Sequence, residues 1–387
     1  MGFAELALIC AVALLGPALA VTRGVQLPVV IGEMFVGVVI GRTGFRLVDP
    51  AGSTLTFMAQ IGFALVMFIA GSHVPMRDPA MRSGVLRGAL RAVGCGVVAM
   101  PLGFGAAAVF GTGHGALYTV LIASSSANII MPVLDGADTA APVIQQLLPQ
   151  IAIANTACIV ALPLAMDPPH ALRATIGGAA VIAAGGVLFV ILQKLAKSGE
   201  ERRAHELSKE RGLALELRFS LTAVFGIAAV AVATQVSVML AGFVAGLAYA
   251  AVGEPRRLAH QLFAVTEGFF GPIFFVWLGA SLDLRQLGAH PDAIVLGLVL
   301  GAAGLVAHGA LLLSRQPWPA AAITAGNLGV PVAAAALGQA LGMLRPGEAP
   351  AMLLGAVVTV ITTAALAGPV RRLAAAQTTD RANPAAK

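Results

Sequence analysis

Polar side chains interrupt several apolar runs, and their types suit ion coordination rather than covalent catalysis. The run IAIANTACIVALP (151–163) carries Asn155 and Thr156 side by side at its middle. Amide and hydroxyl oxygens can coordinate a cation, although neither group titrates. Because polar groups are costly in a lipid-buried helix, this pair predicts either a functional site or two residues that satisfy each other.

Three ionisable side chains inside apolar segments are candidate proton carriers. His308 lies in LVLGAAGLVAHGALLLSR, and imidazole titrates near neutral pH when it is unperturbed. Glu33 and Glu267 lie about eight or nine residues into their segments, roughly 12–14 Å deep at the helical rise per residue. A purely structural role is the alternative for each of the three.

Two apolar segments share the spacing Asn-x-x-x-Pro. SSSANIIMPVL (124–134) contains Asn128 and Pro132. AGNLGVPVAAA (325–335) contains Asn327 and Pro331. Proline removes a backbone donor and clashes with the preceding turn, so each helix is expected to kink or break there.

Broken helices expose half-helix ends, whose dipoles and freed backbone groups can face an ion together with Asn carbonyls and Ser hydroxyls. A lone Asn-x-x-x-Pro is common, but its occurrence in two corresponding helices favours an internal repeat. The predicted ion-binding residues are Asn155, Thr156, Asn128, Ser125, Ser126 and Asn327.

The composition places these residues in an integral membrane protein. The chain is 58% hydrophobic and 11% charged, whereas a soluble domain carries about 25% charge. Strand alternation is absent, which favours an all-α protein over a barrel. The spacing of the cysteines does not indicate a metal site. The sequence has no phosphate-binding Gly loop that would indicate ATP-driven transport, and it indicates no cofactor and no enzyme activity. The positive charges border membrane spans, so nucleic acid is not an expected partner.

A hydrocarbon core of about 30 Å requires roughly 20 apolar residues per helix. On that rule the sequence predicts thirteen transmembrane helices. They lie near 2–22, 24–42, 55–74, 87–110, 115–134, 142–166, 171–196, 213–235, 236–252, 259–282, 293–315, 318–343 and 347–370. The short ninth helix follows the eighth directly.

The charge distribution predicts the orientation, because cytoplasmic loops are enriched in Lys and Arg. With the N-terminus outside and the C-terminus in the cytoplasm, 19 of the 24 basic residues fall in inside loops. We therefore expect a multi-pass protein of the inner (plasma) membrane, surrounded by the lipid bilayer.

The helix count and the two Asn-Pro motifs predict an inverted 6+1+6 repeat within one transporter domain, 1–373. The first repeat spans 1–170, a linking helix and cytoplasmic loop span 171–212, and the second repeat spans 213–373. Helices 5 and 12 are the two broken helices. A short polar tail, 374–387, is expected to follow.

The chain resembles the cation/proton antiporter superfamily, the sodium/hydrogen exchanger fold of bacteria. The matching stretches are LPVVIGEMFVGVVIG (27–41), LVMFIAGSHVPMRDPAMR (65–82), SSSANIIMPVLDG (124–136) and GPIFFVWLGASLDL (271–284). The resemblance implies a homodimer with scaffold helices 1–3 and 8–10. It also implies a core of helices 4–6 and 11–13, in which the broken helices 5 and 12 cross near the ion site and which carries the ion by an elevator-like movement.

The sequence departs from that family where its chemistry is concentrated. In the family the sixth helix carries one or two carboxylates that bind the cation and exchange it for protons, but here it offers Asn155 and Thr156. The eleventh helix offers His308 where a lysine or arginine is expected, and the third ends in Gly71-Ser72-His73 rather than Gly-Leu-Glu. Which of Asn155 and Thr156 occupies the carboxylate position is open.

The leading hypothesis is a secondary transporter that exchanges a monovalent cation, Na+ or K+, for protons by alternating access at an atypical ion site. One alternative keeps the fold without the exchange, as a uniporter or a carrier of an organic or anionic solute. Another is a non-transporting sensor built on the same fold.

Overall fold

The computed structural model of the chain describes residues 2–20, 29–74, 76–77, 79–126, 129–130, 134, 141–166, 171–198, 213–234, 236–253 and 256–382. Helices and their connecting turns account for these residues, and none of the described residues is in a strand. An all-helical backbone suits apolar segments in lipid, because a helix satisfies its N–H and C=O groups within one segment.

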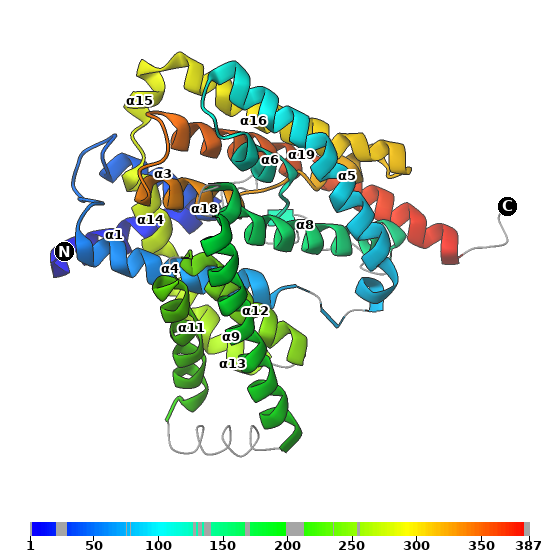
Figure 1. Ribbon diagram of the computed structural model, residues 1–387, viewed down its shortest axis with the longest axis horizontal. Coiled ribbons are helices and arrows are strands. Elements are labelled where there is room, and N and C mark those ends of the chain that lie inside the picture. Colours follow the sequence, from blue (N-terminus) through cyan, green and yellow to red (C-terminus); the bar gives the residue numbers. More distant parts are fainter. Residues whose placement is uncertain are drawn as a thin grey trace. The chain divides into compact units, whose positions relative to one another are not determined.

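The helices divide into two compact units, each of which draws on both halves of the sequence (Figure 1). The first unit combines 1–18, 29–77 and 169–281. Its helices are α1 (Phe3–Ala13), α3 (Val29–Ile40), α4 (Ser53–Ser72), α9 (Ala171–Ser198), α11 (Leu215–Ala233), α12 (Val238–Val252), α13 (Arg256–Val265), the π-helix η2 (Thr266–Phe270) and α14 (Gly271–Ser281). The short α2 (Leu15–Ala20) follows α1 after a break at Leu14.

The second unit is assembled mainly from 78–168 and 282–387. Its helices are α5 (Pro79–Phe110), α6 (Gly115–Ala123), α8 (Pro142–Met166), α15 (Leu284–Ala289), α16 (Pro291–Gly309), the 3-10 helix η3 (Ala310–Ser314), α17 (Trp318–Ile323), α18 (Gly329–Ala340) and α19 (Glu348–Ala382). The second unit therefore collects the helices that the family resemblance assigns to the core, and the first collects the scaffold helices.

Eight helices in the described residues are long and apolar enough to cross a membrane. Four shorter apolar helices accompany them: Phe3–Ala18, Val29–Ile40, Val238–Val252 and Gly329–Gln339. The protein is thus an all-α, multi-pass membrane protein. The count of thirteen and the inverted repeat stay predictions.

Several predicted helices differ in detail from the structure. The tenth, 259–282, is divided by the π-helical turn Thr266–Phe270. The twelfth, 318–343, consists of two helices separated by residues 324–328. The last one continues to Ala382, well past residue 373. Apolar composition located all three segments, but it carried no signal for the π-helical turn of the tenth or for the length of the last. The interruption of the twelfth lies beside the Asn327–Pro331 motif, where the sequence predicts a break.

Glycines bring the backbones of the first unit into close contact, as small residues do in membrane bundles. A Cβ atom on Gly246 of α12 would lie 2.1 Å from the Phe68 carbonyl oxygen of α4, and one on Gly242 would lie 2.0 Å from that of Ala64. Neither position can accept a side chain unless the two helices separate.

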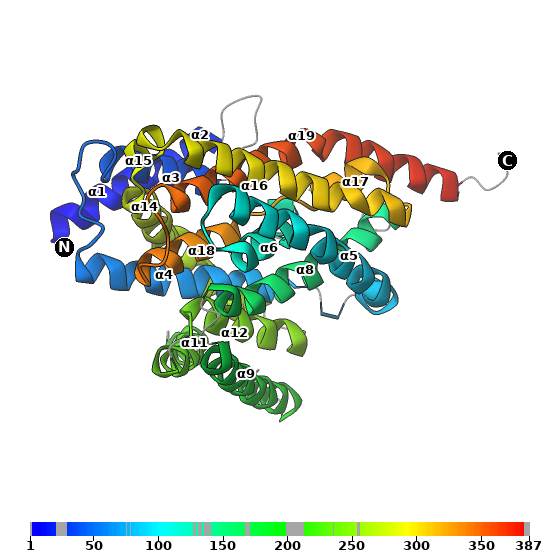
Figure 2. The same cartoon turned by 45° about the horizontal axis from the view of Figure 1, so that its top comes forward.

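The second unit has a buried cluster and an apolar outer face. Ile144, Leu147 and Ile151 of α8 are buried in one cluster with residues of α17 and α19, and α16 and α19 run side by side (Figure 2). On α5, large apolar side chains spaced three or four residues apart stay exposed, which is the pattern of a lipid-facing helix. They include Leu86, Leu90, Val93, Val97, Met100 and Phe104.

We expect Gly246→Ala to lower the thermal stability of the purified protein in detergent. The added methyl group would meet backbone at the α4–α12 contact, and overpacking of this kind costs about 1–3 kcal/mol. Gly226→Ala on α11 is the matched control, because its Cβ would meet nothing within 4 Å. Equal melting temperatures for the two variants would contradict the close approach of α4 and α12.

Candidate functional site

Two interrupted helical segments lie in the second unit. One leaves the helical path at residues 124–126, directly after α6, and the other at residues 324–328, between α17 and α18. Pro331 lies in the first turn of α18 rather than in the interruption. A missing N–H costs no helical hydrogen bond at that position, so this proline is compatible with the start of a half-helix.

Hydrogen bonds join the two interruptions directly. The Ser126 backbone N–H donates to the Gly326 carbonyl at 2.9 Å. The side-chain amide of Asn327 donates to the Ser124 hydroxyl, and to the Leu121 carbonyl at 3.5 Å. Each interruption therefore provides partners for polar groups that the other one leaves without a helical partner.

Hydroxyl groups of α19 bond to the second interruption. Thr359 Oγ1 accepts from the Asn327 backbone N–H at 3.4 Å and donates to the Ala356 carbonyl at 2.8 Å. One turn further along, Thr363 Oγ1 donates to the Ile323 carbonyl at 3.3 Å. Sequence reasoning missed both threonines, although their spacing of four residues in an apolar helix was a usable signal.

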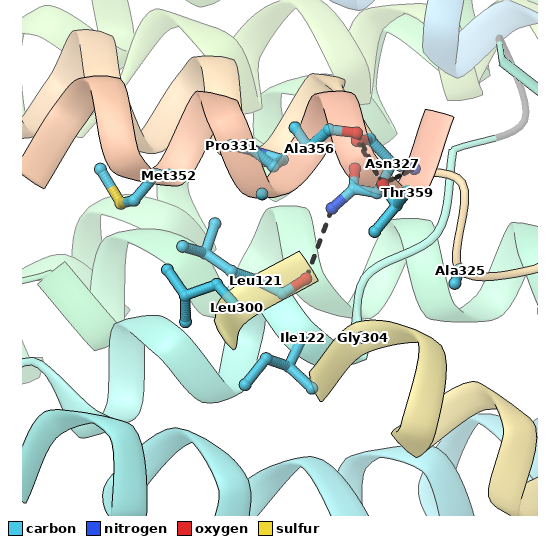
Figure 3. Close-up of a pocket in the computed structure, with 11 residues that line it drawn as sticks. Leu121, Ile122, Leu300, Gly304, Ala325, Asn327, Pro331, Met352, Ala356 and Thr359 are labelled. Atoms are coloured by element: carbon cyan, nitrogen blue, oxygen red, sulfur yellow. Dashed lines mark hydrogen bonds between the residues drawn. The ribbon is translucent and has the colours of Figure 1, made fainter. Parts of the chain in front are cut away.

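A cavity of about 20 Å³ opens beside Asn327 (Figure 3). The close-up shows the amide of Asn327 directed at the Leu121 carbonyl, with Thr359 on its other side. A volume of this size holds one water molecule or one dehydrated ion. Its walls are formed by Leu121, Ile122, Leu300, Gly304, Ala325, Asn327, Pro331, Met352, Gly355, Ala356 and Thr359.

His308 is buried on α16, and its hydrogen bonds define which nitrogen carries the proton. Its Nδ1 lies 2.8 Å from Thr324 Oγ1, which also accepts from Gln150 Nε2 at 3.2 Å. Thr324 donates its single proton to the Ala321 carbonyl at 2.7 Å. With that proton on the Ala321 carbonyl the hydroxyl accepts from the imidazole, and in this arrangement neutral His308 carries its proton on Nδ1 and a lone pair on Nε2.

The Nε2 edge of the imidazole lies against the first interruption. His308 Nε2 is buried and makes no hydrogen bond of normal geometry in the described part of the chain. The backbone carbonyls of Ile122 and Ser124 face the ring. Carbonyl oxygens only accept, so a protonated Nε2 would find partners here that the neutral nitrogen lacks. The C-terminal end of the half-helix α6 also favours positive charge.

The sixth-helix pair lies on α8. Asn155 is buried, and the half-buried Thr156 donates to the Ala152 carbonyl at 2.8 Å, an ordinary bond within a helix. The α8 residue that joins the polar network is Gln150, which also accepts from Gln316 Nε2 at 3.1 Å. The ion-binding role of Asn155 and Thr156 stays a prediction.

The remaining predicted ligands are placed only in part. Ser125 and Ser126 are buried at the first interruption, and Ser125 Oγ has no partner among the residues described. Asn128 and Pro132 lie outside the described residues. The hydroxyls at this interruption are therefore present beside Asn327, while the first Asn-Pro motif itself stays a prediction.

The two predicted glutamates lie in the first unit. Glu33 is buried on α3, where a Cβ on Gly16 would lie 2.6 Å from its Cγ atom. Such packing matches the structural alternative for Glu33. Glu267 lies in the π-helical turn η2 and its side chain is exposed. Single π-helical turns are frequent at functional sites, so the proton-carrier prediction stands for Glu267.

A second polar cluster in the second unit escaped the sequence reasoning altogether. Glu348, at the start of α19, accepts at Oε1 from the Tyr118 hydroxyl at 2.7 Å and lies 2.6 Å from His114 Nδ1. Its Oε2 accepts from the Arg345 backbone N–H at 2.9 Å. These bonds tie the start of α6 to the start of α19, and so help to hold both helices that border the cavity.

Comparison with known proteins now assigns the family. The model of the transmembrane sodium/hydrogen exchanger family matches residues 10–372. The chain belongs to the sodium/hydrogen exchanger family. This assignment confirms the resemblance seen in the sequence. Members of the family are membrane transporters rather than enzymes.

Individual relatives of this exchanger-family chain are distant. YjbQ of Bacillus subtilis, named as a candidate Na(+)/H(+) antiporter, is 24% identical over 385 residues, covering 93% of this chain and 62% of that protein. The glutathione-regulated potassium-efflux protein KefC of Klebsiella pneumoniae is 31% identical over 291 residues, covering 70% and 44% respectively. The chain thus spans less than two thirds of the length of these relatives.

A solved structure shows the same exchanger fold. The sodium proton antiporter MjNhaP1 of Methanocaldococcus jannaschii superposes with a TM-score of 0.64 at 16% sequence identity. The match covers 96% of this chain and 97% of that one. At this level of identity the likeness concerns the fold.

We expect Thr324→Val to destabilise this exchanger-family protein. The variant leaves the N–H groups of His308 and Gln150 without their common acceptor, and an unpaired buried donor costs about 1–3 kcal/mol. Thr324→Ser keeps the acceptor and should melt close to the wild type in detergent. Thr362→Val is the control for loss of a hydroxyl, because among the described residues the Thr362 hydroxyl bonds to the Val358 carbonyl of its own helix. A melting temperature for Thr324→Val equal to that of the control would contradict the network.

Proposed function

We propose that the protein is a secondary transporter that exchanges a monovalent cation, Na+ or K+, for protons by alternating access. The family assignment and the MjNhaP1-like fold support transport, and relatives named for sodium and potassium support the cation class. The observation that carries the proposal is the position of His308, a titratable group held against the joined interruptions.

In this proposal the ion site is neutral and the proton is carried beside it. α8 offers Asn155 and Thr156 in place of a carboxylate, so cation and proton cannot compete for one acidic group. Instead, both are attracted by the carbonyl end of α6, where His308 Nε2 accepts the proton. Two positive charges drawn to the same helix end in a low-dielectric interior repel each other strongly, so binding of one disfavours binding of the other.

The proposal extends to organisation in the membrane. We infer thirteen helices in an inverted repeat, a homodimer, and insertion in the inner membrane with the N-terminus outside. The two units suit a mechanism in which the second carries the site and the first is the scaffold. Each of these statements follows from the family resemblance or from the distribution of basic residues.

A transporter of the same fold without cation/proton exchange is the second candidate. It is favoured by one further observation in the second unit, the buried guanidinium of Arg91. Its Nε and Nη2 bond to the neutral side chains of Ser314 and Gln146, and its Nη1 has no partner among the described residues. A buried cation without a described carboxylate partner would suit a pathway for an anionic solute.

The test is proton flux in proteoliposomes that hold a pH-sensitive dye and receive pulses of Na+, K+ or Li+. We expect cation-evoked flux in the wild type and at least a tenfold loss in His308→Ala, because the proton then has no acceptor at the interruption. His290→Ala, an exposed histidine at the start of the same helix, should retain the flux. Asn155→Asp and Thr156→Asp restore a carboxylate on α8 and complete the set. If the wild type shows no cation-evoked flux while either Asp variant does, the proposed exchange by the wild type is contradicted.

A further inference from the structure

The cavity beside Asn327 lies on the α19 side of the joined interruptions, and its polar wall consists of oxygen-bearing groups. Leu121 contributes a carbonyl close to the end of the half-helix α6, and Thr359 contributes a hydroxyl from α19. Asn327 contributes a side chain that is 3% exposed. The rest of the wall is apolar, so water has few other partners there.

One buried acceptor in the cavity wall has no donor: Asn327 Oδ1 is without a partner among the described residues. At the neighbouring interruption the buried Ser125 hydroxyl also has no described partner. The Leu121 carbonyl accepts from the Ser124 hydroxyl at 2.7 Å, and its bond from the Asn327 amide is longer, at 3.5 Å. A buried acceptor without a donor is costly, whereas a cation satisfies several acceptors at once.

We propose that this cavity is the cation site of the transporter, and that its ligands are the Leu121 carbonyl, the Asn327 amide oxygen and the Thr359 hydroxyl. The inference rests on the proposed exchange, and it moves the cation from α8 to the crossing of the half-helices with α19. The ligand is a dehydrated monovalent cation, because the volume of about 20 Å³ admits a single ion or water molecule.

The side-chain amide of Asn327 supplies the donor that a cation would replace at the Leu121 carbonyl. The Asn327 N–H points at the Leu121 carbonyl, the direction from which a cation would be bound (Figure 3). Rotation of the amide by half a turn exchanges its nitrogen for its oxygen. The cation then bonds to both oxygens, and the end of α6 contributes the negative end of its dipole in place of a carboxylate.

Gly304 of α16 offers a way to fill the site without disturbing the fold. A Cβ on Gly304 would lie 3.5 Å from Thr359 Cγ2 and 3.9 Å from the Ile122 carbonyl oxygen, which are ordinary van der Waals distances. Gly304→Ala therefore adds a methyl group at the wall of the cavity with no backbone clash. Gly309→Ala on the same helix is the matched control, because its Cβ would meet nothing within 4 Å.

The experiment is binding of radioactive Na+ to the purified full chain in detergent, with competition by K+ and Li+. Gly304→Ala and Thr359→Val should raise the half-saturating Na+ concentration at least tenfold. Gly309→Ala and Thr362→Val should stay within twofold of the wild type. If Thr359→Val fails to fold, Gly304→Ala decides the question, with its melting temperature as the folding control.

Two results would overturn the assignment. One is unchanged Na+ affinity in both cavity variants, which would mean that the cavity holds water only. The other is a wild type that binds none of the three cations. The outcome is separable from that of the proposed exchange, since a wild type that binds Na+ through this site but shows no Na+-evoked proton flux would refute exchange and leave the site in place.

Discussion

The second unit depends on how two interrupted helices satisfy the backbone groups that their interruptions release. In a lipid-surrounded interior each such group must find a partner within the protein. Here Ser126 donates to Gly326, Asn327 reaches back to the end of α6, and α19 adds two hydroxyls. This mutual capping lets two half-helices end deep in the unit, and the groups that we propose for the proton and the cation, His308 and the cavity beside Asn327, border the place where they end.

The ion site that we propose for this arrangement is neutral. Where relatives of this fold are expected to place a carboxylate, α8 provides amides and a hydroxyl, so the charge that attracts a cation must come from elsewhere. The carbonyl end of α6 is the available source. His308 faces two of its carbonyls, while the cavity beside Asn327 borders a third. In our proposal, proton and cation share one half-helix end without sharing a ligand, and their exchange is a matter of electrostatic exclusion.

The sequence was sufficient for the fold class and for part of the site. Apolar length located the helices, and the second Asn-Pro motif indicated the interruption around Asn327, because proline and asparagine have local effects. Gln150, Thr324 and Thr359 were missed, because each looks like an isolated polar residue until distant segments bring it to His308 or Asn327. The π-helical turn at Glu267 was equally invisible, since winding within an apolar helix is decided by packing rather than by composition.

Shared attraction to the end of α6 is tested most directly by Na+ affinity as a function of pH, measured on the purified protein. If a proton on His308 excludes the cation, the half-saturating Na+ concentration rises about tenfold for each pH unit below the range in which His308 takes up its proton. In His308→Gln it should be independent of pH over the same range. A wild-type affinity that does not change with pH, or a pH dependence that persists in His308→Gln, would contradict the account.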